Sequence, residues 1–406
     1  MKIKGFKAWR PNKKFVKDVA SVPYDVVDYD QALELSKGNP LSFLHVVRAD
    51  IHFSREDNPY SDKIYQKAKS NLQKLIDEKV LLQESSESIY LYSQKLDDHV
   101  QFGIVATCHI EDYENNVIKI HEKTRKLKEI DRIKYVENQK AHTGPVFLAY
   151  RDCKKINSLV NDLKSKNPIY DFTADDNVQH TLWKFNENNE IINQFKQIPF
   201  AYVADGHHRS ASAVKVAKKR RSENENHNGT ESYNYFLAVL FPESELKILP
   251  YNRVVLSLGM TEDEFISQLN KKFVIKENGI DTPRKPGEIC MFMRGLWSTL
   301  TLRNELSDSD PVAILDVSIL QNYILSPILG IHDPRESNNI DFIGGIKGTK
   351  ELENWINKNK ASVAFSMYPT SMNDLFKVAD AGKLMPPKST WFEPKLRSGL
   401  LINIFD

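Results

Sequence analysis

Cysteine is scarce in this sequence, long apolar runs are missing, and neither sign of charge dominates. The three cysteines, Cys108, Cys153 and Cys290, are odd in number and far apart, which excludes a complete disulfide framework and a cysteine-based zinc site. No stretch approaches the ~20 apolar residues of a membrane span, and the start MKIKGFKAWRP has no signal-peptide core. We therefore expect a cytoplasmic protein with no membrane partner.

The charge balance gives no global basic signal for a nucleic-acid partner, although a local basic cleft stays possible. Lys and Arg number 56 and Asp and Glu 54, which gives a formal net charge of +2. A nucleic-acid-binding protein usually carries a strong basic excess, and no helix-turn-helix pattern stands out, so no nucleic-acid partner is expected. The hydrophobic content of 41% over 406 residues is enough for two or three folded domains.

Strand-like and helix-like segments are interspersed along the whole chain, which predicts a mixed α/β (α+β) fold. For example, Ala68, Leu72 and Leu75 recur at helical spacing and predict an amphipathic helix within residues 62–83. A new series of strand-like and helix-like segments begins at Leu246. We therefore expect one domain over residues 1–245 and a second α/β domain over 246–406. The second ends in an arm rich in proline and lysine.

The stretch FAYVADGHHRSASAV predicts a strand that ends at Asp205 and a helix that starts near His207. Gly206 would let the backbone approach a ligand, and the first N–H groups of the helix favour an anion. Arg209 adds a guanidinium suited to phosphate, and Asp205 could hold magnesium or accept a hydroxyl proton. The alternative is that Asp205 only caps the helix and that His207 and His208 are ordinary surface residues. Five such groups side by side favour an anion-binding or phosphoryl-transfer site.

A second polar group, HEKT, comprises His121, Glu122, Lys123 and Thr124, again where a strand is expected to meet a helix. Glu122 could act as a general base or metal ligand, and Lys123 could neutralise phosphate. A solvated helix face explains the same residues equally well, and both interpretations stay open. An HExxH zinc motif is excluded because Arg125 occupies the position of its second histidine.

Three more positions are candidates. Asp25 follows the stiffening Pro23 in VPYDVVD, where it could face a pocket or only stabilise a turn. Arg253 lies within an apolar strand and could contact phosphate, form an ion pair or mark a sheet edge. In the proline-rich stretch at 381–400, Lys388 could contact a ligand, or the stretch could pack its aromatic residues onto the core. The sequence contains no GxxxxGK[ST] phosphate loop.

Five motifs together resemble a known family: VPYDVV, NPLSFL, HEKT, ADGHHR and MPPKSTWFEPKLRSGL. In this order, over nearly the whole chain, they are similar to the bacterial and archaeal domain of unknown function 1015, whose members are often described as SpoOJ/ParB-like. The DGHHR element also resembles the nucleotide-gripping junction of the ParB/sulfiredoxin fold and the Asp-Gly-His motif of free L-serine kinases built on that fold.

The resemblance implies a ParB/sulfiredoxin-like nucleotide-binding core with an additional C-terminal α/β domain. In those kinases the motif lies at the phosphates and the amino-acid substrate, and a separate acidic residue is the base. Asp205 would then orient serine or magnesium, while Glu122 and Asp25 both remain candidates for the base. The predicted catalytic residues are Asp205, Glu122, Asp25 and His208. The predicted nucleotide contacts are Gly206, His207, His208, Arg209, Ser210, His121, Lys123, Thr124, Arg253 and Lys388. The predicted metal ligands are Asp205 and Glu122.

The sequence thus predicts a nucleotide-dependent phosphotransferase acting on a small hydroxylated metabolite, with free L-serine as the leading acceptor. ATP or ADP would be the donor and Mg²⁺ the metal. The alternative from another class is a ParB-like nucleotide-binding sensor that transfers nothing. Whether the protein forms a homodimer is left open.

Overall fold

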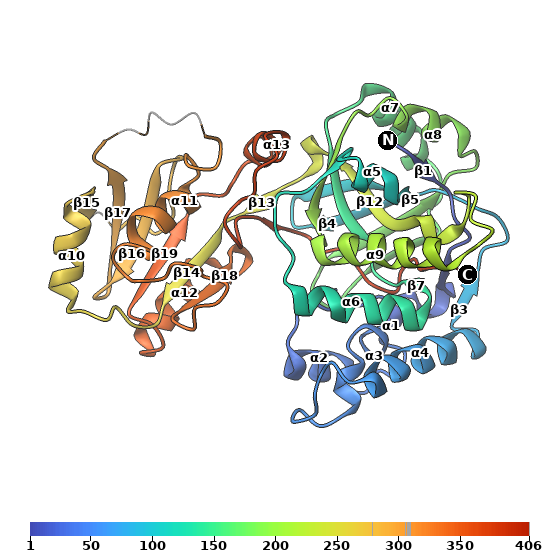
Figure 1. Cartoon of the computed structure of the whole chain (residues 1–406), viewed down its shortest axis with the longest axis horizontal. Coiled ribbons are helices and arrows are strands. Elements are labelled where there is room, and N and C mark those ends of the chain that lie inside the picture. The colour runs from blue at the N-terminus through green and yellow to red at the C-terminus, as the bar shows by residue number, and fades with distance from the viewer. Residues whose placement is uncertain (278, 305, 307–309, 406) are drawn as a thin grey trace. The chain divides into compact units, whose positions relative to one another are not determined.

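Figure 1 shows the computed structural model of the chain, which describes residues 1–277, 279–304, 306 and 310–405. The chain divides into two compact units. The first comprises Met1–Lys119, Thr124–Leu246 and Pro394–Asp406, and the second comprises Ile120–Lys123 and Lys247–Glu393. The chain therefore enters the second unit briefly before residue 124 and returns to the first at Pro394. Both units mix helices and strands, which confirms the mixed α/β class.

The first unit is built on a nine-stranded sheet with the order β6-β11-β8-β12-β5-β4-β10-β9, and β1 pairs with β5 at its side. The β11–β6 and β12–β8 pairs are parallel, and the other pairs of this sheet are antiparallel. Its strands are β1 (Ile3–Lys4), β4 (Tyr90–Leu96), β5 (His99–His109), β6 (Ile118–Lys119), β8 (Val146–Tyr150), β9 (Tyr170–Thr173), β10 (Gln179–Lys184), β11 (Ala201–Asp205) and β12 (Tyr235–Pro242).

Helices and two small sheets complete the first unit. Its helices are α1 (Val16–Val19), α2 (Tyr29–Ser36), α3 (Leu44–Val47), α4 (Asp62–Asp77), α5 (Ile110–Glu114), α6 (Lys126–Gln139), α7 (Lys154–Lys164), α8 (Asn189–Phe195) and α9 (His207–Glu223). The small sheets pair β2 (Trp9–Pro11) with β3 (Leu81–Gln83) and β7 (Ala141–His142) with β21 (Asn403–Ile404). Helices α6 and α9 pack side by side (Figure 1).

Helix α4 shows why the apolar spacing was informative. Ala68, Leu72 and Leu75 are buried on one face of it, as predicted. The helix ends at Asp77 rather than continuing to residue 83, because Lys79 adopts a left-handed φ of 57° and the chain then forms β3. The spacing of the apolar residues thus predicted which face of α4 is buried, whereas the positive φ of Lys79 determines where the helix ends.

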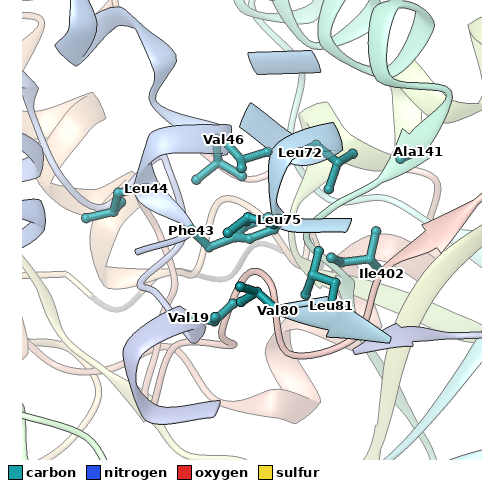
Figure 2. Packing of buried hydrophobic residues seen from close by; sticks show 11 residues of the cluster. Val19, Phe43, Leu44, Val46, Leu72, Leu75, Val80, Leu81, Ala141 and Ile402 are labelled. Atoms are coloured by element: carbon teal, nitrogen blue, oxygen red, sulfur yellow. The ribbon is translucent and has the colours of Figure 1, made fainter. Parts of the chain in front are cut away.

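One apolar cluster of the first unit gathers residues from distant parts of the chain (Figure 2). Phe43, Leu72 and Leu75 lie at its centre, and Ile402 joins them from the C-terminal arm. Ile402 is fully buried, and burial of such a side chain stabilises a fold by about 1.5–3 kcal/mol. The arm therefore supplies part of the core of the first unit.

Backbone contacts fix the arm in place. Ser398 and Ser21 exchange backbone hydrogen bonds of 2.9 and 3.1 Å. The next residue, Gly399, has a φ of +79°, and a Cβ there would lie 2.4 Å from Cγ of Phe43. Only glycine combines this conformation with such a close approach to the ring.

The second unit is built on a six-stranded sheet with the order β15-β17-β16-β19-β14-β18, in which all pairs are antiparallel. Its strands are β14 (Tyr251–Val255), β15 (Phe273–Glu277), β16 (Glu288–Met293), β17 (Leu296–Leu302), β18 (Ile340–Gly344) and β19 (Val363–Met367), and β13 (Ile248–Leu249) pairs separately with β20 (Trp391–Phe392). Its helices are α10 (Glu262–Asn270), α11 (Asp316–Leu320), α12 (Gly348–Asn357) and α13 (Met372–Asp380). No helix in the described part of the chain is long and apolar enough to cross a membrane.

Candidate functional site

The predicted strand–turn–helix junction is present in the first unit. Strand β11 ends at Asp205, and α9 starts at His207. Gly206, between them, is the N-cap residue of the helix and has a φ of +94°. Its N–H donates a 2.8 Å hydrogen bond to Oδ1 of Asp205. Because glycine has no side chain, Gly206 forms no side-chain cap at the N-terminus of α9.

The guanidinium of Arg209 lies directly over Gly206. A Cβ at residue 206 would lie 3.0 Å from Nε and 3.1 Å from Cζ of Arg209. Nη1 of Arg209 donates to the carbonyl of Pro145, which fixes the orientation of the side chain. Glycine is thus required here both for its backbone conformation and for the space that Arg209 fills.

Two carboxylates face the same nitrogen of Arg209. Its Nη2 lies 3.6 Å from Oδ2 of Asp25 and 3.7 Å from Oδ2 of Asp205. Burial lowers the pKa of Arg209, but the two carboxylates outweigh this and raise it. The side chains of Asp25 and Asp205 keep 33% and 28% of their surface exposed, so a ligand in solution can reach both.

Asp25 is positioned by a turn that another arginine holds. Nη1 of Arg48 donates to the carbonyls of Tyr24 and Val27, on either side of the turn. The remaining donors of Arg48 form two bonds of 3.0 and 2.7 Å with Asp50. The turn places Asp25 beside Arg209.

Lys395, from the C-terminal arm, contacts Asp205, and the sequence alone did not predict this contact. Its Nζ lies 3.3 Å from Oδ2 of Asp205. Burial raises the pKa of Asp205, but Lys395 and then Arg209 outweigh burial and hold that pKa well below its usual range. Asp205 is therefore an anion at neutral pH and lies between two cations.

The two histidines of the motif differ in their surroundings. Nε2 of His208 accepts a 3.0 Å hydrogen bond from the backbone N–H of Arg125. Burial lowers the pKa of His208 while Asp25 opposes that effect, so the neutral form that accepts this bond is favoured. His207 is buried. Ser210 is fully buried, and its hydroxyl donates to the carbonyl of His207 within the same helix.

An arginine clamped between two tyrosine rings lies next to this group. The guanidinium carbon of Arg132 lies 3.8 Å from the ring centre of Tyr24 and 4.0 Å from that of Tyr135. Arg132 also donates to Asp131, whose other carboxylate oxygen accepts from Tyr65 at 3.0 Å. The aromatic clamp anchors the residue preceding Asp25 to helix α6.

A small cavity of about 40 Å³ lies within the first unit and is lined in part by Arg209. Its polar lining residues are Tyr24, Arg132, Gln139, His142, Thr143, Arg209, Ser212 and Ser398. A cavity of this size has room for about three water molecules and is far smaller than a nucleotide.

The HEKT group is divided between the two units. Thr124 belongs to the first unit, and its hydroxyl donates a 2.6 Å hydrogen bond to Glu129 in helix α6. His121, Glu122 and Lys123 belong to the second unit. There the carbonyl of His121 accepts a 2.8 Å hydrogen bond from the N–H of Met385.

The remaining two predicted residues meet in the second unit. Nη2 of Arg253 donates a 3.0 Å hydrogen bond to the carbonyl of Lys388. The structure thus groups Asp25, Asp205, His208 and Arg209 in the first unit and Arg253 and Lys388 in the second. Among the residues that the structure describes, no group of three or more His, Cys, Asp or Glu side chains could hold a metal ion.

Comparison with known proteins identifies a family. The sequence model of the family described as "Protein of unknown function (DUF1015)" matches residues 3–318. No curated protein matches the chain.

Several solved structures are similar to the chain. A conserved hypothetical protein from Pyrococcus furiosus is 12% identical, with a TM-score of 0.37, and the match covers 72% of this chain and 93% of that one. A free serine kinase in complex with AMP is 12% identical, with a TM-score of 0.39 and coverage of 74% and 91%. SbnI from Staphylococcus aureus, truncated at its C-terminus, is 11% identical, with a TM-score of 0.40 and coverage of 72% and 85%.

The family match spans most of the chain, including four of the five motifs by which the family was predicted, and it confirms that prediction. The chain belongs to the DUF1015 family of proteins of unknown function.

Proposed function

We propose that the protein is a nucleotide-dependent phosphotransferase that acts on a small hydroxylated metabolite, with free L-serine as the leading acceptor. The observation that carries the proposal is Arg209, held over the start of α9 between two solvent-accessible carboxylates. A helix N-terminus with an adjacent guanidinium favours a phosphate group, and phosphoryl transfer needs positioning and charge stabilisation above all. The Asp-Gly-His element at this junction is also the motif that resembles the free L-serine kinases.

Asp25 is the better candidate for the base. It lies in the first unit beside Arg209, whereas Glu122 belongs to the second unit. Its partly exposed carboxylate can accept the proton of an incoming hydroxyl group. Asp205 is less suited to this role because Lys395 and Arg209 both neutralise it, and it instead fixes the N–H of Gly206 and the guanidinium.

In the proposed reaction, the acceptor oxygen attacks the terminal phosphorus of the nucleotide while its proton passes to Asp25. The bond between that phosphorus and the bridging oxygen breaks, and the shortened nucleotide leaves with the electron pair. Arg209 and the N–H groups of the first turn of α9 stabilise the charge on the transferring group. Because Asp205 already faces two cations, it does not fit a magnesium ion held by the protein, and no step passes through a metal.

The test is a product assay on the purified protein. L-Serine is incubated with ATP, ADP or CTP in buffer containing Mg²⁺, and O-phosphoserine is measured by mass spectrometry. Product from at least one donor supports the proposal. Nucleotide binding without product from serine or from a panel of small hydroxylated metabolites would contradict it and favour the sensor alternative.

A further inference from the structure

Arg253 is a buried charge in the second unit. It lies in strand β14, between β18 and β19, and only 3% of its surface is exposed. Burying a charged side chain is costly unless an opposite charge compensates it.

The groups that contact Arg253 are neutral. Its Nη1 donates to the carbonyl of Tyr251 and its Nη2 to the carbonyl of Lys388, and the ring of Phe342 lies 5.6 Å from its guanidinium carbon. Among the described residues, no carboxylate forms an ion pair with it. Burial lowers the pKa of Arg253 to about 10, so the side chain still carries its charge near neutral pH. Two carbonyl oxygens satisfy two of its five N–H groups and leave the positive charge without a counter-ion.

The loop formed by residues 385–390 carries a second cation, Lys388. The hydroxyl of Ser389 donates to the carbonyl of Pro386, and the hydroxyl of Thr370 donates to the carbonyl of Ser389. Lys388 has a left-handed φ of +60°, which a lysine adopts at a cost in free energy. Its side chain is exposed, and its Nζ lies 5.4 Å from the ring centre of Tyr251. The loop thus carries an exposed ammonium group, and its carbonyl at residue 388 contacts the buried guanidinium.

We propose that Arg253 and Lys388 form an anion site in the second unit that binds a phosphate group, either free or carried by a small metabolite. Two cations match the charge of a phosphate dianion, and the planar guanidinium suits its oxygens. The hydrogen bond to the carbonyl of Lys388 fixes the loop, so that ligand binding and loop conformation are coupled. This site lies in a different unit from Gly206 and does not depend on the proposed transfer activity.

Lys388→Gly is the decisive variant because it removes the ammonium group and keeps the carbonyl that Arg253 contacts. Glycine adopts positive φ readily, so thermal stability should stay the same or rise. Binding of inorganic phosphate to the full chain, measured by isothermal titration calorimetry, should weaken about 10-fold. Lys140→Gly is the matched control, since Lys140 is also exposed and has a φ of 50°, but it lies in the first unit. It should leave phosphate affinity unchanged.

Arg253→Met tests the buried partner and should abolish this binding, while Arg253→Lys should retain a weaker form of it. If Arg253→Met does not fold, Lys388→Gly decides alone. Equal affinity of the wild type and Lys388→Gly would overturn the proposal, and so would acetate binding that is as tight as phosphate binding. Glycerol 3-phosphate separates the two sources: tighter binding than phosphate identifies a metabolite, and weaker binding identifies the free ion. Gly206→Ala alters the proposed transferase site in the first unit, so it should leave the effect of Lys388→Gly on phosphate affinity unchanged. A failure of the transferase proposal can therefore be told apart from a failure of this one.

Discussion

The carboxylate of Asp25 lies 3.6 Å from the guanidinium of Arg209, although the two residues come from distant parts of the sequence. One is in a turn held by Arg48, and the other is in the first turn of α9. This pairing gives Asp25 a defined position next to the group that would bind the transferring phosphate. It also distinguishes Asp25 from Glu122, which sequence reasoning left as an equal candidate for the base.

Asp25→Asn is expected to reduce phosphoryl transfer by about 100- to 10,000-fold, because asparagine cannot accept the hydroxyl proton. Its stability should change by less than about 1 kcal/mol, since the side chain is one-third exposed and Arg209 keeps Asp205 as a partner. Turnover at saturating substrate and urea unfolding measure the two effects. Glu122→Gln is the comparison variant, and if it loses activity while Asp25→Asn retains it, the base has been assigned to the wrong residue.

Gly206→Ala should displace Arg209 and weaken nucleotide binding, because its Cβ would lie 3.0 Å from Nε of Arg209. Gly229→Ala is a matched control. Gly229 has nearly the same φ, +91°, but nothing lies within 4 Å of its Cβ position. Both substitutions should cost about 1–2 kcal/mol of stability through backbone strain. Only Gly206→Ala should lower nucleotide affinity, as measured by calorimetry, and an equal effect of both variants would show that strain alone is responsible.

Lys395→Met should destabilise the protein in a pH-dependent manner. Lys395 and Arg209 hold the pKa of Asp205 below its ordinary value of 3.8 in the folded state. The stabilisation from Asp205 is therefore fully present above about pH 4 and is lost as the pH falls through the folded-state pKa. The difference in unfolding free energy between wild type and variant should be about 1–2 kcal/mol at pH 7 and shrink below pH 4. A difference independent of pH would indicate lost packing of the lysine stem instead.

His142→Gln should remove a second pH dependence. Burial lowers the pKa of His142 from 6.5 to about 4, so between these values the unfolded chain binds a proton that the folded protein does not. Wild-type stability should therefore fall by about 3 kcal/mol as the pH drops from 6.5 to 4, owing to this residue. Urea unfolding across this range should show a flatter profile for the variant. Parallel profiles for the two proteins would mean that the pKa of His142 is not lowered in the folded state.

Local sequence signals predicted the parts of the site that depend on neighbouring residues. The apolar run before Asp205 forms the buried strand β11, and the small residues after Arg209 form α9. Glycine at position 206 matches the positive φ of the N-cap. These features follow from propensity and periodicity, which act over a few residues.

Contacts set by topology escaped prediction. Nothing near Lys395 in the sequence indicates that it meets Asp205, because that contact requires the chain to return from the second unit to the first. The assignment of His121, Glu122 and Lys123 to the second unit likewise has no local signal. The only indication for Lys395 was its place in an ordered-looking stretch rich in proline and glycine, and that stretch does not specify a partner.

The return of the arm also determines when the first unit can be completed in the cell. Ile402 and strand β21 leave the ribosome only after every residue of the second unit has been synthesised. Until then the nascent chain exposes an apolar gap beside Phe43 and leaves Asp205 without its lysine partner. The contacts of the first unit are therefore completed only after the residues that follow the second unit have been synthesised.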